Sequence, residues 1–169
     1  MCSADIEYAV QKNPFDVETW KADLAPFHRA GGKILHWHGM EDPVISSDNS
    51  ARYYNLVSQT MGKSPAELDH FYRYFRVSGA GHCTGGTGAW QIGQTTSGTS
   101  KLTSEDNILM RMVDWVENGN APETVRGTKF VNDTASLGTA FVRDHCRYPR
   151  RNTYCGYGDP TRATSWHCE

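Results

Sequence analysis

Three stretches of the chain carry apolar residues at the three-to-four-residue spacing of an amphipathic helix. They are residues 16–30, with Val17, Trp20, Leu24 and Phe27; residues 47–61, with Ser47 or Asp48 as N-cap; and residues 103–118, with Ile108, Leu109, Met112, Val113, Trp115 and Val116. Each stretch is followed by glycine, at Gly31-Gly32, Gly62 and Gly119. Glycine readily takes the left-handed conformation that ends a helix. The pattern therefore predicts three helices.

Short apolar segments lie between these helices. Residues 33–38 and 71–77 are rich in aromatic and β-branched side chains and predict strands, whereas 128–131 and 139–143 are weaker strand candidates. Residues 79–100 are rich in Gly, Ser and Thr without periodicity and predict a loop. Strands alternating with helices favour an α/β fold with parallel strands and crossover helices. Two strands cannot cover three helices, so we expect further strands from outside this sequence and interpret the chain as a fragment.

Composition narrows the function classes. The chain has 169 residues, enough for one domain, and a net charge of −2. Without a basic field, nucleic acid and anionic membrane surfaces are not expected partners. No apolar run approaches the roughly 20 residues of a membrane span.

Cysteine usage indicates the compartment. Of five cysteines, Cys146, Cys155 and Cys168 fall in the last 24 residues, in a tail with few core-forming residues. Such a tail favours a disulfide and an oxidising, extracellular setting, although the N-terminus has no signal-peptide pattern. Five is an odd number, so at least one cysteine is unpaired or has its partner elsewhere.

The candidate chemistry lies after the two strands. Asp42 follows the first strand and His82 the second, 40 residues later. Carboxyl ends of parallel strands meet at one sheet edge, and this is where reactive groups collect in open α/β sheets. Asp before His is also the end of the Ser, Asp, His order of α/β-hydrolases, in which Asp orients the imidazole. None of the 41 residues before Asp42 forms the expected G-x-S-x-G turn.

Other interpretations of the same residues stay open. Asp42-Pro43 alone is typical of a turn, and a single His is often structural. Cys83, within Gly81-His-Cys-Thr-Gly85, could be a nucleophile with His145 or His167 as its base. His36 and His38, on one face of a strand, could bind a metal together with Asp42. Trp90 could line an aromatic acyl pocket or simply pack in its loop.

Two blocks and the tail make the resemblance specific. They run from Gly31 to Tyr54 through Asp42, from Phe71 to Gly86 through His82-Cys83, and through His145-Cys146-Arg-Tyr-Pro149, Asn152-Thr-Tyr154 and Trp166-His-Cys168. These blocks resemble the fungal tannase and feruloyl esterase family of secreted α/β-hydrolase serine esterases. The resemblance covers residues from about Asn13 to Cys168.

The resemblance implies a chemistry and a domain organisation. Asp42 would be the acid and His82 the base of a Ser-Asp-His triad that hydrolyses small phenolic esters. It also implies a Cys146–Cys168 bridge, and Cys83 as half of a bridge whose partner precedes the nucleophile, outside this chain. We divide the chain into 1–125, the C-terminal portion of the catalytic domain carrying Asp42 and His82, and 126–169, a C-terminal strand and disulfide-stapled tail.

The chain also departs from the family pattern. The Gly-Cys-Ser-Thr-Gly-Gly elbow is absent, since Cys2-Ser3 has no glycines after it. The lid domain that carries the family's calcium site is absent too, so no cofactor is expected in this chain. The expected function is therefore that of a carboxylic ester hydrolase. Of its Ser-Asp-His triad, only the Asp and the His are present in this chain. The alternative is a catalytically inactive truncated fragment or binding remnant.

Overall fold

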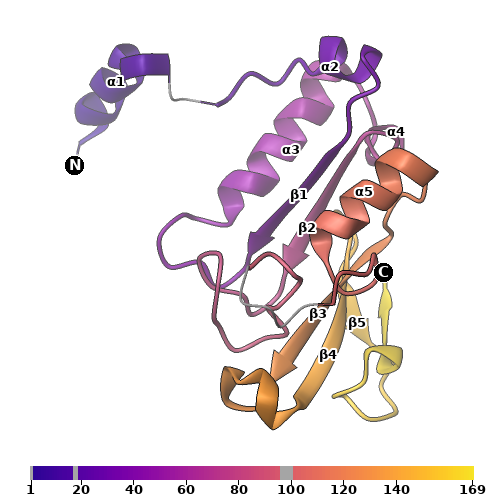
Figure 1. The fold of residues 1–169 in the computed structure, drawn as a ribbon. Coiled ribbons are helices and arrows are strands. Elements are labelled where there is room, and N and C mark those ends of the chain that lie inside the picture. Colours follow the sequence, from indigo (N-terminus) through magenta and orange to yellow (C-terminus); the bar gives the residue numbers. More distant parts are fainter. Residues whose placement is uncertain (1, 17–18, 96–100) are drawn as a thin grey trace.

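The computed structural model describes residues 2–16, 19–95 and 101–169 (Figure 1). Its helices are α1 (Ser3–Lys12), α2 (Ala25–Arg29), α3 (Asp48–Met61), α4 (Pro65–Leu68) and α5 (Ile108–Asn118), with 3-10 turns at Pro14–Asp16, Val131–Asp133, Ala135–Leu137 and Ala163–Ser165. Its strands are β1 (Ile34–Gly39), β2 (Tyr72–Val77), β3 (Thr124–Phe130), β4 (Thr139–Cys146), β5 (Asn152–Tyr154) and β6 (Trp166–Cys168). The chain is a mixed α/β structure.

The parallel pair β1–β2 is the centre of the fold. The two strands are parallel, as the sequence predicts, and their register runs from Ile34 opposite Tyr72 to Gly39 opposite Val77. Side chains alternate between the two faces of a strand. One face packs Tyr72 and Tyr74 against α3, and the other packs Phe75 and Val77 in a cluster with the start of α5. The two helices therefore cover opposite faces of the pair (Figure 1).

The two outer edges of this pair differ. Along β2, the chain after β4 continues the hydrogen bonding, because the Tyr148 N–H donates to the Tyr74 carbonyl and Arg147 bridges Phe75. Along β1, no strand of the described residues pairs with the outer edge. Main-chain groups of every second β1 residue therefore point to an unpaired sheet edge.

Two of the three predicted helices have different bounds from those expected. The helix expected over 16–30 is wrong for most of its length: only Ala25–Arg29 is helical, and residues 17 and 18 lie outside the described part. Pro26 explains the late start, because proline is tolerated only in a helix's first turn. The helix expected from residue 103 begins instead at Ile108. There the side chain of Asn107 accepts hydrogen bonds from the Leu109 and Met110 N–H groups.

The helix expected over 47–61 is confirmed as α3. Ser47 occupies the N-cap position without a side-chain capping bond, and Gly62, with φ of 60°, ends the helix. The sequence patterns missed α1, in which no residue is buried, and the single-turn α4. No helix in the described part of the chain combines the length and apolar character needed to cross a membrane.

The C-terminal portion is built from two antiparallel hairpins. β3 and β4 extend the two weak strand predictions, and the boundary expected after residue 125 lies within β3. The β5–β6 hairpin was not predicted, since each strand has only three residues. The Cys146–Cys168 disulfide implied by the resemblance is present and joins the end of β4 to β6. This bridge fixes a tail that has little apolar core of its own.

Candidate active site

Asp42 and His82 come together where β1 and β2 end. The Met40 N–H donates to the Val77 carbonyl, and the Glu41 N–H donates to the Ala80 carbonyl at 2.8 Å. These bonds extend the pairing beyond the strands, so the two loops leave the sheet side by side. Nδ1 of His82 then lies 2.8 Å from Oδ2 of Asp42. The sequence prediction that these residues meet is confirmed.

The two side chains have different exposure. The Asp42 side chain is 5% exposed, and the His82 side chain is 43% exposed. Nε2 of His82 makes no hydrogen bond within residues 2–16, 19–95 and 101–169. A buried carboxylate behind an accessible imidazole is the arrangement that a general base needs, because the free ring nitrogen can receive a proton from a reacting group.

Asp42 is held as a carboxylate by several donors. Its Oδ1 accepts hydrogen bonds from the N–H groups of Val44 at 2.8 Å and Ile45 at 2.9 Å. Its Oδ2 contacts His82 and also Nε2 of His38, at 3.2 Å. Burial works to raise the pKa of Asp42, but the hydrogen bonds from Ile45, His82 and Val44 outweigh it and hold that pKa well below its usual range.

Close backbone packing shapes the loop that carries His82. A Cβ atom on Gly39 would lie 2.4 Å from the carbonyl oxygens of Ala80 and Gly81. A Cβ atom on Gly86, where φ is 112°, would lie 2.2 Å from the Gly79 carbonyl oxygen. Only glycine allows these contacts. The glycines around His82 therefore let its loop fold tightly onto the end of β1.

The two histidines of β1 are engaged within the protein. Nδ1 of His36 lies 2.9 Å from the Tyr72 hydroxyl, and Nδ1 of His38 lies 2.7 Å from Oγ of Ser50. Burial, with a smaller effect of His38, lowers the pKa of His36 to about 4, so this imidazole is neutral near pH 7. No group of three His, Cys, Asp or Glu side chains among the described residues is placed to hold a metal ion. The metal interpretation thus has no support.

The alternative with Cys83 as nucleophile also lacks a base. His145 is fully buried, with Nε2 donating to the Ala89 carbonyl at 2.9 Å. Nδ1 of His167 lies 3.4 Å from Sγ of Cys155. Neither imidazole therefore serves Cys83, which is exposed and free.

Comparison with known proteins identifies the family. The family model described as tannase and feruloyl esterase matches residues 8–169. This chain belongs to that family. It is 51% identical over 164 residues to a protein named "Probable feruloyl esterase B-2" from Aspergillus terreus, and 50% identical to "Probable feruloyl esterase B-1" from Aspergillus flavus. Each match covers 97% of this chain but 31% of the relative, so the chain spans about a third of their length.

Solved structures of the family agree with this fold. A crystal structure of an esterase from Aspergillus oryzae superposes on all of this chain with a TM-score of 0.95 and 48% identity, over 33% of its own length. A tannin acyl hydrolase from Aspergillus niger superposes on 96% of this chain with a TM-score of 0.69 and 29% identity, over 27% of its length. The fold of this chain therefore matches about a third of these larger structures.

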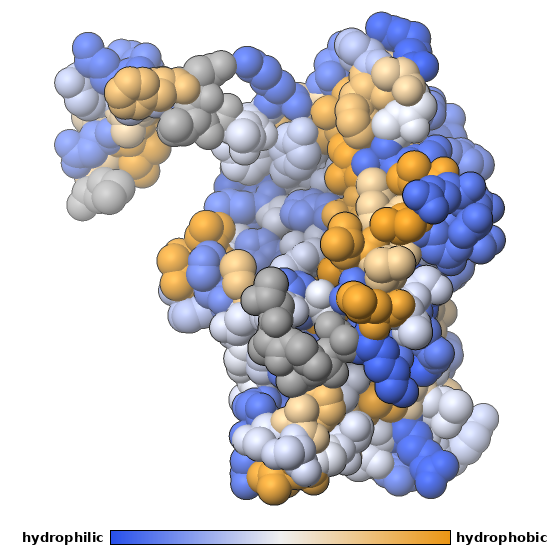
Figure 2. All heavy atoms as spheres, in the orientation of Figure 1, coloured by the Kyte–Doolittle hydropathy of each residue, from blue (hydrophilic) through white to orange (hydrophobic). Residues whose placement is uncertain are grey.

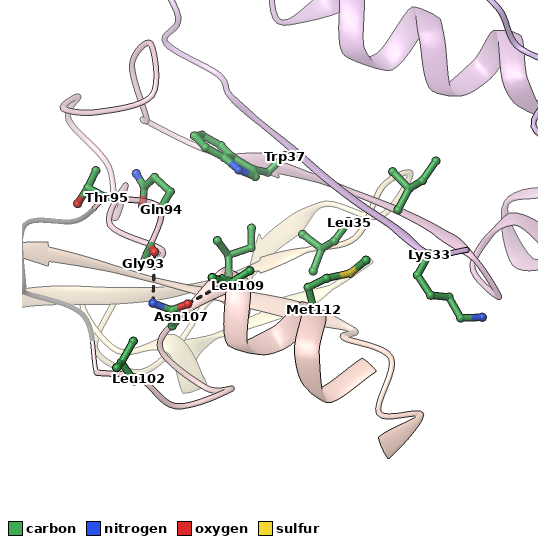
Figure 3. Close-up of a pocket in the computed structure, with 12 residues that line it drawn as sticks. Lys33, Leu35, Trp37, Gly93, Gln94, Thr95, Leu102, Asn107, Leu109 and Met112 are labelled. Atoms are coloured by element: carbon green, nitrogen blue, oxygen red, sulfur yellow. Dashed lines mark hydrogen bonds between the residues drawn. The ribbon is translucent and has the colours of Figure 1, made fainter. Parts of the chain in front are cut away.

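A hollow lies beside the unpaired edge of β1, away from Asp42 and His82. It has a volume of about 990 Å³ and is lined mainly by apolar side chains of β1 and α5 (Figure 3). Figure 2 shows apolar side chains gathered over the region of α5, where Leu109 is 66% and Val116 is 60% exposed. Trp37 lines this groove, whereas Trp90 is buried and donates from Nε1 to Asp133 at 2.8 Å. Trp90 thus belongs to the core cluster with Phe75 and Val125 and does not line this hollow.

Some contacts of the site could not be found from the sequence patterns. Ser50, in the first turn of α3, contacts His38, and Thr87 binds the side chain of Glu41. In the sequence, His38 was noticed only as one of two neighbouring histidines. Its spacing of four residues from Asp42 is the feature that could have indicated the contact between these two side chains.

Proposed function

We propose that this chain supplies the acid and the base of a Ser-Asp-His triad in a carboxylic ester hydrolase of the feruloyl esterase type. The observation that carries the proposal is the hydrogen bond of 2.8 Å between buried Asp42 and accessible His82. His82 would take the proton of a serine hydroxyl and give it to the oxygen of the leaving alcohol. It would then take a proton from the attacking water and return it to the serine oxygen. Asp42 would hold the Nδ1–H tautomer and stabilise the imidazolium that forms.

The nucleophile would come from polypeptide outside these 169 residues. No serine hydroxyl hydrogen-bonds His82 in the part of the chain that the structure describes. The unpaired edge of β1 and the apolar groove beside α5 are where further strands of a larger sheet would pack. An oxyanion hole would likewise come from backbone N–H groups near that serine. By itself, the chain is therefore expected to be inactive.

The family supports a proposal for the substrate class. Relatives are named probable feruloyl esterase, and one solved structure is named tannin acyl hydrolase. We assign this chain the same class, small phenolic esters, with no cofactor bound by its own residues. The Cys146–Cys168 disulfide supports an oxidising, extracellular location.

A chimera tests the proposal. Residues 1–169 replace the matching third of the Aspergillus oryzae esterase, which shares 48% identity with them. Hydrolysis of methyl ferulate is then measured for the chimera and for the isolated chain. We expect turnover from the chimera and none from the chain alone, because acyl transfer needs the nucleophile. In the chimera, His82→Ala should lower kcat by several orders of magnitude, and Asp42→Asn by about 10⁴-fold.

The control variant is His70→Ala, at an exposed histidine that precedes β2, whereas His82 follows the other end of that strand. It should leave turnover unchanged. A folded chimera whose activity survives His82→Ala would disprove the assigned roles. Turnover by the isolated chain that is lost on Ser3→Ala or Cys83→Ala would show that the nucleophile lies within these residues.

A further inference from the structure

Two imidazoles share one oxygen of Asp42. Nδ1 of His82 lies 2.8 Å from Oδ2, and Nε2 of His38 lies 3.2 Å from the same atom. Oδ1 is meanwhile occupied by the Val44 and Ile45 N–H groups. An ionised carboxylate only accepts hydrogen bonds, so both ring nitrogens must present N–H groups to Oδ2.

The two imidazoles differ in what their second nitrogen does. Nδ1 of His38 lies 2.7 Å from Oγ of Ser50, and the His38 side chain is only 13% exposed. If His38 donated to Ser50 instead, the lone pair of its Nε2 would face a carboxylate oxygen, which is repulsive. In its neutral form, His38 therefore carries its proton on Nε2, and Ser50 donates to its Nδ1. His82 has no such second partner, which leaves it as the imidazole that can exchange protons.

We propose that His38, fixed by Ser50, is a positioning residue for the triad acid. Its N–H holds Oδ2 of Asp42 in the direction of His82 and so restricts rotation of the carboxylate. Because Ser50 stands in the first turn of α3, the chain of contacts ties the acid to a packed helix. Rigid support of this kind keeps a catalytic hydrogen bond at productive geometry.

The catalytic role of the contact between His38 and Asp42 rests on the proposed function. The contact itself can be measured without turnover. The readout is the tautomer of each neutral imidazole, obtained from ¹⁵N chemical shifts of the isolated 169-residue chain in alkaline buffer. A hydrogen bond at one ring nitrogen decides which nitrogen carries the proton. In the unaltered chain we expect Nδ1–H at His82 and Nε2–H at His38.

Three variants separate positioning from mere packing. His38→Leu removes the donor, so the Nδ1–H form of His82 should fall from nearly all to a minor share. His38→Gln keeps an N–H donor and should restore most of it. Ser50→Ala frees Nδ1 of His38 and so loosens its ring, and the Nδ1–H share of His82 should therefore fall part of the way, whereas Asn49→Ala, one position away on α3, should change neither histidine.

The outcomes are decisive in each direction. A folded His38→Leu chain that keeps His82 fully in the Nδ1–H form would overturn the positioning role. If His38→Leu does not fold, an unchanged His82 tautomer in Ser50→Ala overturns the proposal instead. A different result, Nε2–H at His82 in the unaltered chain, would contradict the assignment of the triad and so count against the proposed function.

Discussion

The carboxylate of Glu41 binds both the N–H and the hydroxyl of Thr87, 46 residues away in the chain. Glu41 directly precedes Asp42, and Thr87 follows His82 in the loop after β2. Hydrogen bonds from the Thr87 side chain and backbone lower the pKa of Glu41, so it is ionised near neutral pH. The contact joins the acid loop to the base loop independently of the Asp42–His82 bond.

We expect Thr87→Val to loosen this connection without unfolding the chain. The substitution keeps the side-chain shape and removes the hydroxyl, and because Glu41 is exposed, the free energy of unfolding should fall by less than about 1 kcal/mol. Hydrogen exchange of the Glu41 N–H, which donates to Ala80, should become faster. Thr84→Val, at an exposed position of the same loop, is the control. Equal exchange in both variants would show that Glu41 does not hold the loops together.

The free energy of unfolding should decrease as the pH falls from about 6.5 to about 4, because two histidines stay neutral in the folded chain. Burial lowers the pKa of both His36 and His145 to about 4, while the unfolded chain binds protons near 6.5. Between these values only the unfolded state is protonated. Each histidine then removes about 1.4 kcal/mol per pH unit, and its contribution is fully present only above about pH 6.5.

Denaturant unfolding at several pH values checks this expectation. His145→Gln should reduce the slope of the unfolding free energy against pH by the contribution of one bound proton. A glutamine amide can still donate to the Ala89 carbonyl, but it does not titrate. His70→Gln, at an exposed imidazole, should leave the slope as it is. If His145→Gln and the unaltered chain have the same slope, the buried histidine is not the source of the pH dependence.

The sequence predicts the part of the fold that depends on local pattern. The parallel strands, α3, and the meeting of Asp42 with His82 follow from periodicity and from the rule that parallel strands end at one edge. The helix expected over 16–30 failed because Pro26 overrides an otherwise helical spacing. Tertiary contacts could not be predicted, because the sequence around Ser50 or Thr87 does not indicate a partner that only the fold brings close.

Gly127→Ala should be strongly destabilising. A Cβ atom there would lie 1.9 Å from the Ala89 carbonyl oxygen and 2.6 Å from Nε2 of His145, so β3 and the loop after His82 would have to move apart. Overpacking of this kind costs about 1–3 kcal/mol, and the loss of the His145 hydrogen bond adds to it. Gly119→Ala, where φ is 76° but the Cβ meets open space, should cost only about 1–2 kcal/mol. Thermal unfolding of the two variants compares them, and a smaller loss for Gly127→Ala would refute the close packing.

Thiol alkylation should separate the cysteines into two classes. In folded, non-reduced protein, Cys2, Cys83 and Cys155 should react and Cys146 and Cys168 should not, because only the last two are bridged. Reduction should then loosen the tail before the rest, since the bridge closes a segment of 22 residues and contributes on the order of 3 kcal/mol in the chain-entropy model. Cys146→Ser should reproduce that loss, whereas Cys83→Ser should leave the stability of the isolated chain nearly unchanged. Peptide mass mapping reads the alkylation pattern. A Cys83–Cys155 bridge in the map would contradict both the structure and the expectation that the partner of Cys83 lies outside this chain.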